Sequence, residues 1–187
     1  MSRKNLQPKP YLYPLPVLII GTYDENGIPD AMNAAWGTVC DMNQVAIFLS
    51  ATHKTTKNIL LKQAFTVSMA DAKNVVEADY VGVVSANKEP NKLEKTKWTI
   101  VKSEVIDAPI FAELPLTLEC KLVSYNEETE CAVGEIVNVS IDEDIIDANG
   151  KIDLNKFKPI AYDTSNHVYV TLGEKVGNAF KDGFNLK

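Results

Sequence analysis

The sequence has few of the residues that reactive side-chain chemistry usually requires. It contains two histidines in 187 residues, His53 and His167, and neither lies in an H-E-x-x-H or G-x-S-x-G motif. Isolated histidines are more often ordinary surface or core residues than catalysts. No G-x-G-x-x-G segment follows an expected strand, and no Walker motif is present. The sequence therefore predicts no hydrolytic catalytic residue and no Rossmann dinucleotide-binding unit.

Cysteine is also scarce, and the chain lacks an excess of positive charge. Cys40, Cys120 and Cys131 are odd in number and widely spaced, which fits neither a disulfide framework nor a metal-binding knuckle. The net charge of −6 argues against a nucleic-acid-binding protein. The segment DANGKID, residues 147–153, lacks the closing glutamate of a calcium loop and predicts a hairpin turn instead. We therefore expect reduced thiols, no metal site and no nucleic-acid partner.

No long hydrophobic run is present. The first ten residues are polar and contain proline, and Pro14 and Pro16 interrupt the apolar stretch that follows. This predicts neither a signal peptide nor a membrane span, and we expect a cytoplasmic protein. Apolar residues make up 45% of the chain and charged residues 24%, which is typical of soluble globular proteins. We expect one domain over residues 1–187.

Short strands outnumber helices in the segments that the sequence does contain. The dipeptide Asn26-Gly27 predicts a tight hairpin with positive φ at both residues. Residues 36–51 predict two strands around a polar turn at 41–44. Further strands are expected in FTVSMA (65–70), WTIVKSEVI (98–106), LTLECKLVSYNE (116–127), CAVGEIVNVSID (131–142) and HVYVTLGE (167–174).

One segment has a clear helical pattern. In residues 52–65 the apolar side chains recur at helical spacing with lysines opposite, and Thr55 or Thr56 is suited to cap its start. A second helix is expected in residues 74–84, with a break at Gly82, and residues 176–184 predict one helical turn. Many short strands with few helices predict a mainly β fold, a largely antiparallel β-barrel with helical inserts.

The segment FLSATHKTTKNI, residues 48–59, combines hydroxyl groups and cations where a strand ends and a helix begins. Hydroxyls, cations and the free N–H groups of a helix start together favour phosphate binding. The alternative is a hydroxyl-rich helix cap beside a solvated lysine, and spacing leaves both open. The residues concerned are Ser50, Thr52, His53, Lys54, Thr55 and Thr56.

The segment NAAWGTV, residues 33–39, has the composition of a wall for a planar ligand. Asn33 offers a donor and an acceptor, Ala34 and Ala35 permit close approach, and Trp36 offers a flat face. The same residues also suit an ordinary bend between two packed strands. The segment alone does not decide between these interpretations.

Six segments, taken in order, resemble the flavin reductase-like proteins of the flavoredoxin group. They are NAAWG, HKTTKNI, DYVGVVSANKEPNKLEK, ELPLTLEC, VGEIV and YVTLGE, and the resemblance runs from Pro14 to about Phe184. Each segment is unspecific alone, whereas the six in this order are a strong signal. The resemblance implies a split β-barrel of Greek-key topology that binds FMN. It also implies a homodimer with the flavin near its interface and NAD(P)H as the electron donor.

The resemblance also implies the cofactor-binding residues. Asn33, Ala34 and Ala35 would lie along the isoalloxazine edge, while Trp36 stacks nearby, supports the wall or belongs to the core. Residues 50–55 would hold the phosphate. Lys92 would reach the flavin or its phosphate, unless it is merely solvated. The expected FMN-binding set is Asn33, Ala34, Ala35, Trp36, Ser50, Ala51, Thr52, His53, Lys54, Thr55, Ser85 and Lys92.

The chain departs from the family pattern at four points. Ala86 replaces the usual glycine after Ser85, Asn91 replaces an aspartate, the phosphate segment lacks its common arginine, and ETECAVGE lacks a histidine. We expect FMN to bind with altered affinity or potential. No catalytic side chain is required, because the cofactor supplies the redox chemistry. Three functions remain: an NAD(P)H-dependent flavin oxidoreductase with an unidentified acceptor, a non-catalytic FMN electron carrier, or a flavin-free β-barrel binding module.

Overall fold

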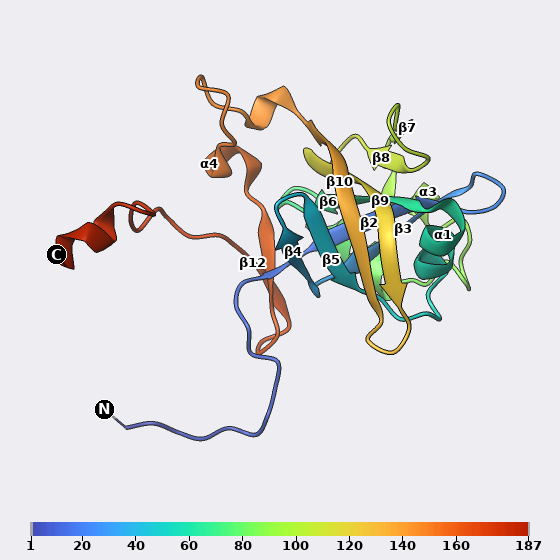
Figure 1. Ribbon diagram of the computed structural model, residues 1–187. Helices are drawn as coiled ribbons and strands as arrows, with labels where there is room; N and C mark the ends of the chain where they lie inside the picture. Colours follow the sequence, from blue (N-terminus) through green and yellow to red (C-terminus); the bar gives the residue numbers. More distant parts are fainter. Residues whose placement is uncertain (1, 187) are drawn as a thin grey trace.

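The computed structural model describes residues 2–186, and most of its regular structure is β (Figure 1). The strands are β1 (Leu15–Pro16), β2 (Leu18–Tyr23), β3 (Pro29–Ala34), β4 (Gly37–Asp41), β5 (Gln44–Phe48), β6 (Ala64–Met69), β7 (Ile100–Lys102), β8 (Pro109–Phe111), β9 (Leu116–Asn126), β10 (Cys131–Ile141), β11 (Ile160–Asp163) and β12 (Val168–Thr171). The helices are α1 (Lys54–Lys62), α2 (Val75–Val83), α3 (Leu93–Thr96), η1 (Glu143–Ile145), α4 (Leu154–Phe157) and η2 (Asp182–Leu186). The mainly β fold expected from the sequence is confirmed.

The main sheet has seven strands in the order β3-β2-β6-β9-β10-β5-β4, and every pair is antiparallel. Its two edge strands, β3 and β4, are consecutive in the chain and are joined by residues 35 and 36 alone. Two residues span only about 10 Å, so a flat sheet of this width is impossible. The sheet must curl until its edges approach each other, which gives the half-barrel seen in Figure 1.

Gly37 permits this closure at the start of β4. A Cβ atom added there would lie 2.6 Å from Leu18 Cδ1 and 3.0 Å from Ile47 Cγ2. Any larger residue would push β4 away from the core side chains of β2 and β5. The glycine after Trp36 therefore serves the packing of neighbouring strands.

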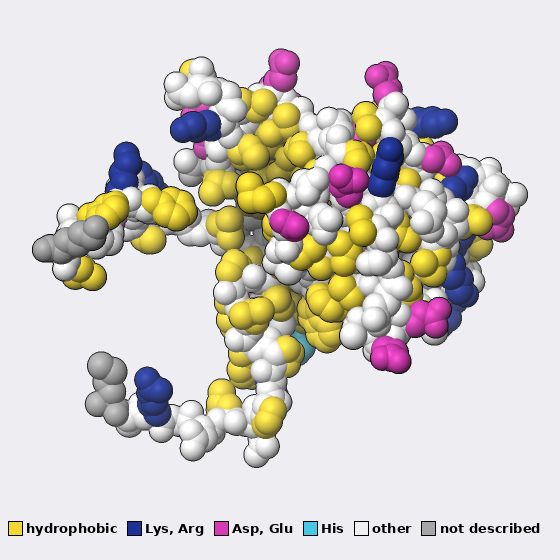
Figure 2. Space-filling view, in the orientation of Figure 1, with side chains coloured by type: hydrophobic (Ala, Val, Ile, Leu, Met, Phe, Trp, Pro, Cys, Tyr) yellow, Lys and Arg dark blue, Asp and Glu magenta, His cyan; other side chains and the backbone are white. Residues whose placement is uncertain are grey.

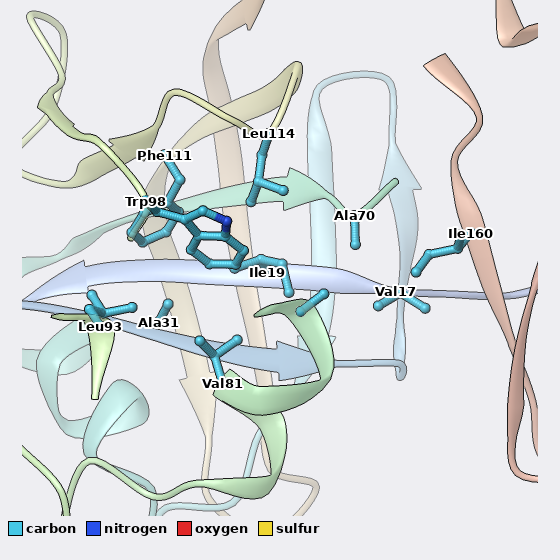
Figure 3. Close-up of a cluster of buried hydrophobic side chains, with 11 residues drawn as sticks. Val17, Ile19, Ala31, Ala70, Val81, Leu93, Trp98, Phe111, Leu114 and Ile160 are labelled. Carbon is cyan, nitrogen blue, oxygen red and sulfur yellow. The ribbon is translucent and has the colours of Figure 1, made fainter. Parts of the chain in front are cut away.

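Two hydrophobic clusters lie on opposite faces of β2, all six residues of which are buried. Leu18 and Ile20 contribute to the cluster inside the curled sheet. Ile19 contributes to the outer cluster, where the rings of Trp98 and Phe111 lie 5.2 Å apart (Figure 3). Because successive side chains of a strand alternate in direction, one central strand serves both clusters. The outer cluster fixes α2 and α3 against β3, where the candidate site lies.

The expected hairpin at residues 26 and 27 is present between β2 and β3, but its turn differs from the prediction. Gly27 has φ 76°, whereas Asn26 is not in the left-handed region. Asp24 Oδ1 accepts the N–H groups of Asn26 and Ile28, each at 2.9 Å. A side-chain acceptor therefore shapes this turn where a second positive φ was expected.

Other local predictions had mixed outcomes. The turn at Gly150 is confirmed, with φ 74° and an N–H donated to the carbonyl of Asp147.

The strand expected over 98–106 is only the three residues of β7, because Trp98 packs in the outer cluster instead. β11 was missed, since Pro159 directly before it lowers the strand signal. Strands β1 and β12 pair with β11 in a separate three-stranded sheet.

The segments before β1 and after β12 extend away from the curled sheet (Figure 1). Figure 2 shows hydrophobic side chains on both. Among the described residues, no helix combines the length and apolar character needed to cross a bilayer. Within the same part of the chain, no group of three or more histidine, cysteine or acidic side chains is placed to hold a metal ion.

Candidate functional site

The first turn of α1 is the starting point of the candidate site. His53 is the N-cap residue, and its side chain makes no capping hydrogen bond. The prediction that Thr55 or Thr56 caps the helix is wrong, because both lie inside the first turn. That turn contains no acidic residue, so its N–H groups face outward without a nearby negative side chain on the same helix.

The hydroxyl groups expected around a phosphate are only partly free. Thr55 Oγ1 donates to Asp30 Oδ2 at 2.6 Å, and Thr56 Oγ1 donates to the carbonyl of Ser50 at 2.8 Å. Ser50 Oγ and Thr52 Oγ1 lie 3.1 Å apart in the preceding turn. Ala51 and Thr52 are exposed there. The Thr55 hydroxyl thus ties the helix start to β3, and the Thr56 hydroxyl ties it to the turn after β5.

Lys54 is held by an ion pair with Asp24, whose Oδ2 lies 3.1 Å from the ammonium group. Burial acts to raise the pKa of Asp24, but the N–H groups of Ile28 and Asn26 and the Lys54 ammonium together lower it. The lysine is therefore tethered to the β2–β3 turn, close to the helix start.

A small hollow of about 90 Å³ lies where β3, the start of α1 and the end of α2 meet. It brings together five of the residues expected to bind FMN, which come from two segments more than 25 residues apart: His53, Lys54, Thr55, Ser85 and Lys92. The grouping of these two segments was expected from the family resemblance alone.

Lys92 is buried, so the interpretation of it as a solvated lysine is wrong. Its side chain is 3% exposed, and Nζ donates to the carbonyls of Val81 and Val84, both at 2.8 Å. Those carbonyls belong to the C-terminal end of α2, where a cation is favourable. Burial lowers the pKa of Lys92, and Asp30, 3.7 Å away, opposes that shift.

Asp30 was not predicted, yet its buried carboxylate lines the small hollow. Oδ2 accepts the Thr55 hydroxyl, whereas Oδ1 accepts no hydrogen bond from any described residue. No local signal distinguishes it, since an acidic residue shortly after a turn is normally solvated. Only the packing of α1 and α2 against β3 buries it.

A larger hollow of about 330 Å³ adjoins the small one, and Gly82 lines both. The expected break at Gly82 is absent, because α2 continues to Val83. A Cβ atom at Gly82 would lie 2.9 Å from Asn33 Cβ, so glycine lets the helix pack on β3. Asn33 Nδ2 donates to the carbonyl of Ala78 at 2.9 Å, and Asn33 and Ala35 line this hollow as well.

The opposite wall of the larger hollow comes from the β11–β12 hairpin. Tyr162 OH lies 2.8 Å from His167 Nδ1, and Tyr169 OH donates to Asp79 Oδ1 at 2.7 Å. Burial, followed by the Asp79 carboxylate, raises the pKa of Tyr169 to about 12. His167 has φ 54°, a conformation that glycine adopts more easily.

The segment NAAW does not form one continuous wall. Ala34 is buried in the inner cluster, and Trp36 is 58% exposed, so the interpretation of Trp36 as a core residue is wrong. Trp36 lines a separate apolar hollow of about 420 Å³ together with Leu12 and Phe48. Asn33 and Ala35 thus face one hollow while Trp36 faces another.

Four site residues were missed, and one was set aside. Asp30, Asp79, Tyr162 and Tyr169 were not singled out, and His167 was considered an ordinary histidine. Tyr169 lies in the segment YVTLGE and Asp79 begins the segment DYVGVVSANKEPNKLEK, so both lie in segments that carry the family resemblance. The others are brought to the site by strand pairing and helix packing across long stretches of chain.

Comparison with known proteins agrees with this architecture. The model of the flavin reductase like domain matches residues 11–169. Flavoredoxin of Desulfovibrio vulgaris (Miyazaki F) superimposes with a TM-score of 0.93 and 33% identity, covering 97% of this chain and 100% of that one. Flavoredoxin from Methanosarcina acetivorans gives 0.89 and 26%, with both chains covered completely.

A third structure supports the fold alone. A putative flavin reductase with a split barrel domain from Shewanella frigidimarina gives a TM-score of 0.73 at 21% identity, covering 88% of this chain and 84% of that one. The curled sheet is accordingly a split barrel. Since the family model spans most of its length, the chain belongs to the flavin reductase-like family.

Proposed function

We propose that this protein is an FMN-binding oxidoreductase that passes electrons from NAD(P)H through the flavin to an acceptor. One observation carries the proposal: the uncapped start of α1 borders a small polar hollow that adjoins, through Gly82, a larger hollow with aromatic walls. A phosphorylated planar molecule has the two parts that such a pair of hollows suits.

The helix start fits a phosphate group. The N–H groups of Lys54, Thr55 and Thr56 have no acceptor among the described residues, as is usual for a first helical turn. His53 and Ser85 add side-chain donors at the same hollow. We propose that these groups hold the phosphate, and the expected twelve-residue set stays a prediction.

The larger hollow fits a flavin ring. Ala35 and Gly82 have little or no side chain and so leave room for a ring along one wall, where Asn33 supplies polar atoms. Tyr162 and Tyr169 supply flat faces on the other wall. When bound, FMN supplies hydride and single-electron transfer. The protein's own groups bind and orient the ring and restrict the access of water.

Absorption spectroscopy of the purified protein tests the proposal. We expect a flavin spectrum, bleached by anaerobic addition of NADH or NADPH and restored by an acceptor. A flavin spectrum without turnover of NAD(P)H would favour the electron carrier. A colourless protein that FMN cannot reconstitute would contradict the proposal and favour the flavin-free binding module. As a matched pair, Ser85→Ala should weaken FMN binding and Ser165→Ala, in the β11–β12 turn, should not.

We also propose a homodimer. Trp36 is 58% exposed and Leu12 71% exposed at the same apolar hollow, and Phe180 is 97% exposed on the extended C-terminal segment. Exposed apolar surface of this kind marks association sites. Sedimentation should give twice the chain mass of 20.6 kDa, and a monomer across the accessible concentration range would refute this.

We propose the cytoplasm as its location. All three cysteines are free, and Cys40 is exposed. Exposed thiols persist in a reducing compartment. Fractionation of the source cells followed by immunoblotting would test this.

A further inference from the structure

We infer that Asp30 is a hydrogen-bond acceptor for the bound flavin and that its Oδ1 atom takes an uncharged donor of the ligand, a side-chain hydroxyl or the ring imide N–H. This inference rests on the proposed FMN binding. It assigns to the small hollow a preference for an uncharged hydrogen-bond donor, which the proposed phosphate-binding residues do not provide.

The burial of Asp30 is the first argument. Its carboxylate is 2% exposed and lines the small hollow, yet Oδ1 receives no hydrogen bond from the described residues. Lys92 Nζ lies 3.7 Å from Oδ1, beyond hydrogen-bond distance, and is engaged by two carbonyl groups. A buried carboxylate oxygen without a donor is costly, so a ligand donor at this point would be strongly bound.

The orientation of Asp30 is fixed before any ligand arrives. Thr55 Oγ1 donates to Oδ2 at 2.6 Å, and this hydrogen bond sets the plane of the carboxylate. Thr55 itself is buried in the first turn of α1. A preorganised acceptor loses little freedom on binding, which increases its contribution to affinity.

The charge of Asp30 selects the kind of donor. A carboxylate repels a phosphate, so the phosphate belongs at the uncapped helix start and not beside Oδ1. An uncharged hydroxyl or imide N–H is attracted by the same atom. FMN carries both groups, and the two can be removed separately in analogues.

Glu119 is a buried carboxylate in which both oxygens accept hydrogen bonds, unlike Asp30. It is also 2% exposed, but Asn138 Nδ2 donates to Oε1 at 2.6 Å and the Ser103 hydroxyl donates to Oε2. Glu119 lies on β9, outside the two hollows. It therefore provides a matched control for the removal of a buried charge.

The test compares dissociation constants for three ligands: FMN, FMN methylated at the imide nitrogen, and an FMN analogue whose phosphorylated side chain lacks hydroxyls. The wild type should bind one analogue about ten- to a hundredfold more weakly than FMN. Asp30→Asn should weaken FMN by a similar factor and lose the preference, whereas Glu119→Gln should keep it. If the wild type binds the methylated ligand more weakly, the donor to Asp30 is the imide N–H. If it binds the analogue without hydroxyls more weakly, the donor is a hydroxyl.

The outcomes separate this inference from the proposed function. If the wild type binds FMN and all three ligands bind alike, or if Asp30→Asn keeps the preference, the inference fails and the proposed function stands. If the wild type binds no FMN, both fail. Should Asp30→Asn not fold, the double variant Asp30→Asn/Lys92→Met removes both buried charges and is compared with the wild type in the same way.

Discussion

The two neighbouring hollows differ in how their side chains are held. In the small hollow, Asp30, Thr55 and Lys92 are buried and bonded to one another or to the backbone of α2. In the larger hollow, Tyr162 and His167 form a hydrogen bond near the surface on a hairpin. Substitutions in the small hollow should therefore lower the free energy of unfolding and weaken ligand binding. Substitutions in the larger hollow should mainly weaken ligand binding.

Lys92→Met should have the largest effect. It leaves Asp30 as a buried, uncompensated charge and deprives the Val81 and Val84 carbonyls of a donor. We expect the free energy of unfolding to fall by about 3–5 kcal/mol, measured by urea denaturation. Lys95→Met, which removes an exposed ion pair with Glu89, should change little. Equal effects of the two substitutions would contradict the contrast between the hollows.

Thr55→Val should come next. Valine has nearly the same shape but cannot donate to Asp30 Oδ2, so the carboxylate loses the hydroxyl that donates to it. We expect a loss of about 1–3 kcal/mol in the same denaturation experiment. Thr52→Val, at an exposed hydroxyl, should stay within about 0.5 kcal/mol of the wild type. A neutral Thr55→Val would show that Asp30 does not depend on this donor.

Tyr169→Phe tests the larger hollow through its pH dependence. The folded pKa of about 12 exceeds the ordinary value of 10.0, so this phenol contributes stability below pH 10 that is lost as the pH rises through 12. The near-ultraviolet titration of tyrosinate should lose its latest step in this variant and keep it in Tyr11→Phe. At neutral pH the loss of stability should be at most about 1 kcal/mol. A late step that survives in Tyr169→Phe would contradict the assignment.

His167→Gly should have the smallest effect, and of opposite sign. Glycine relieves the left-handed conformation at φ 54°, which offsets the lost hydrogen bond to Tyr162. We expect stability unchanged or raised by about 0.5 kcal/mol in thermal unfolding, with weaker flavin binding. His53→Gly, at φ −67°, should bring no such gain. A clear destabilisation by His167→Gly would show that the Tyr162 contact outweighs the strain.

Local signals predicted the elements of this fold well, because their physical cause acts within a few residues. The turn after Asp24 and the turn at Gly150 follow from side-chain acceptors and glycine conformations nearby. The helix α1 follows from its apolar spacing. Short elements without such a signal were not predicted, among them β1, β8, β11, α3 and α4.

The candidate site was only partly predictable. The structure places His53, Lys54, Thr55 and Ser85 at one hollow, and the family resemblance, not their spacing, predicted that they would lie together. Trp36 was expected beside Asn33, whereas the structure places it at a different hollow. The place of these side chains depends on how α1 and α2 pack on the sheet and on which strands pair, and neither is a local property of the sequence.

The sequence by itself determined a mainly β chain, its hairpin turns, its main helix and its likeness to flavin reductase-like proteins. These depend on residue types and short spacings, which act locally. Only the tertiary structure decided that Asp30 and Lys92 are buried together and that the β11–β12 hairpin faces Asn33. Which side chains are buried and which segments lie opposite each other depend on long-range strand order and helix packing. No short stretch of sequence contains that information.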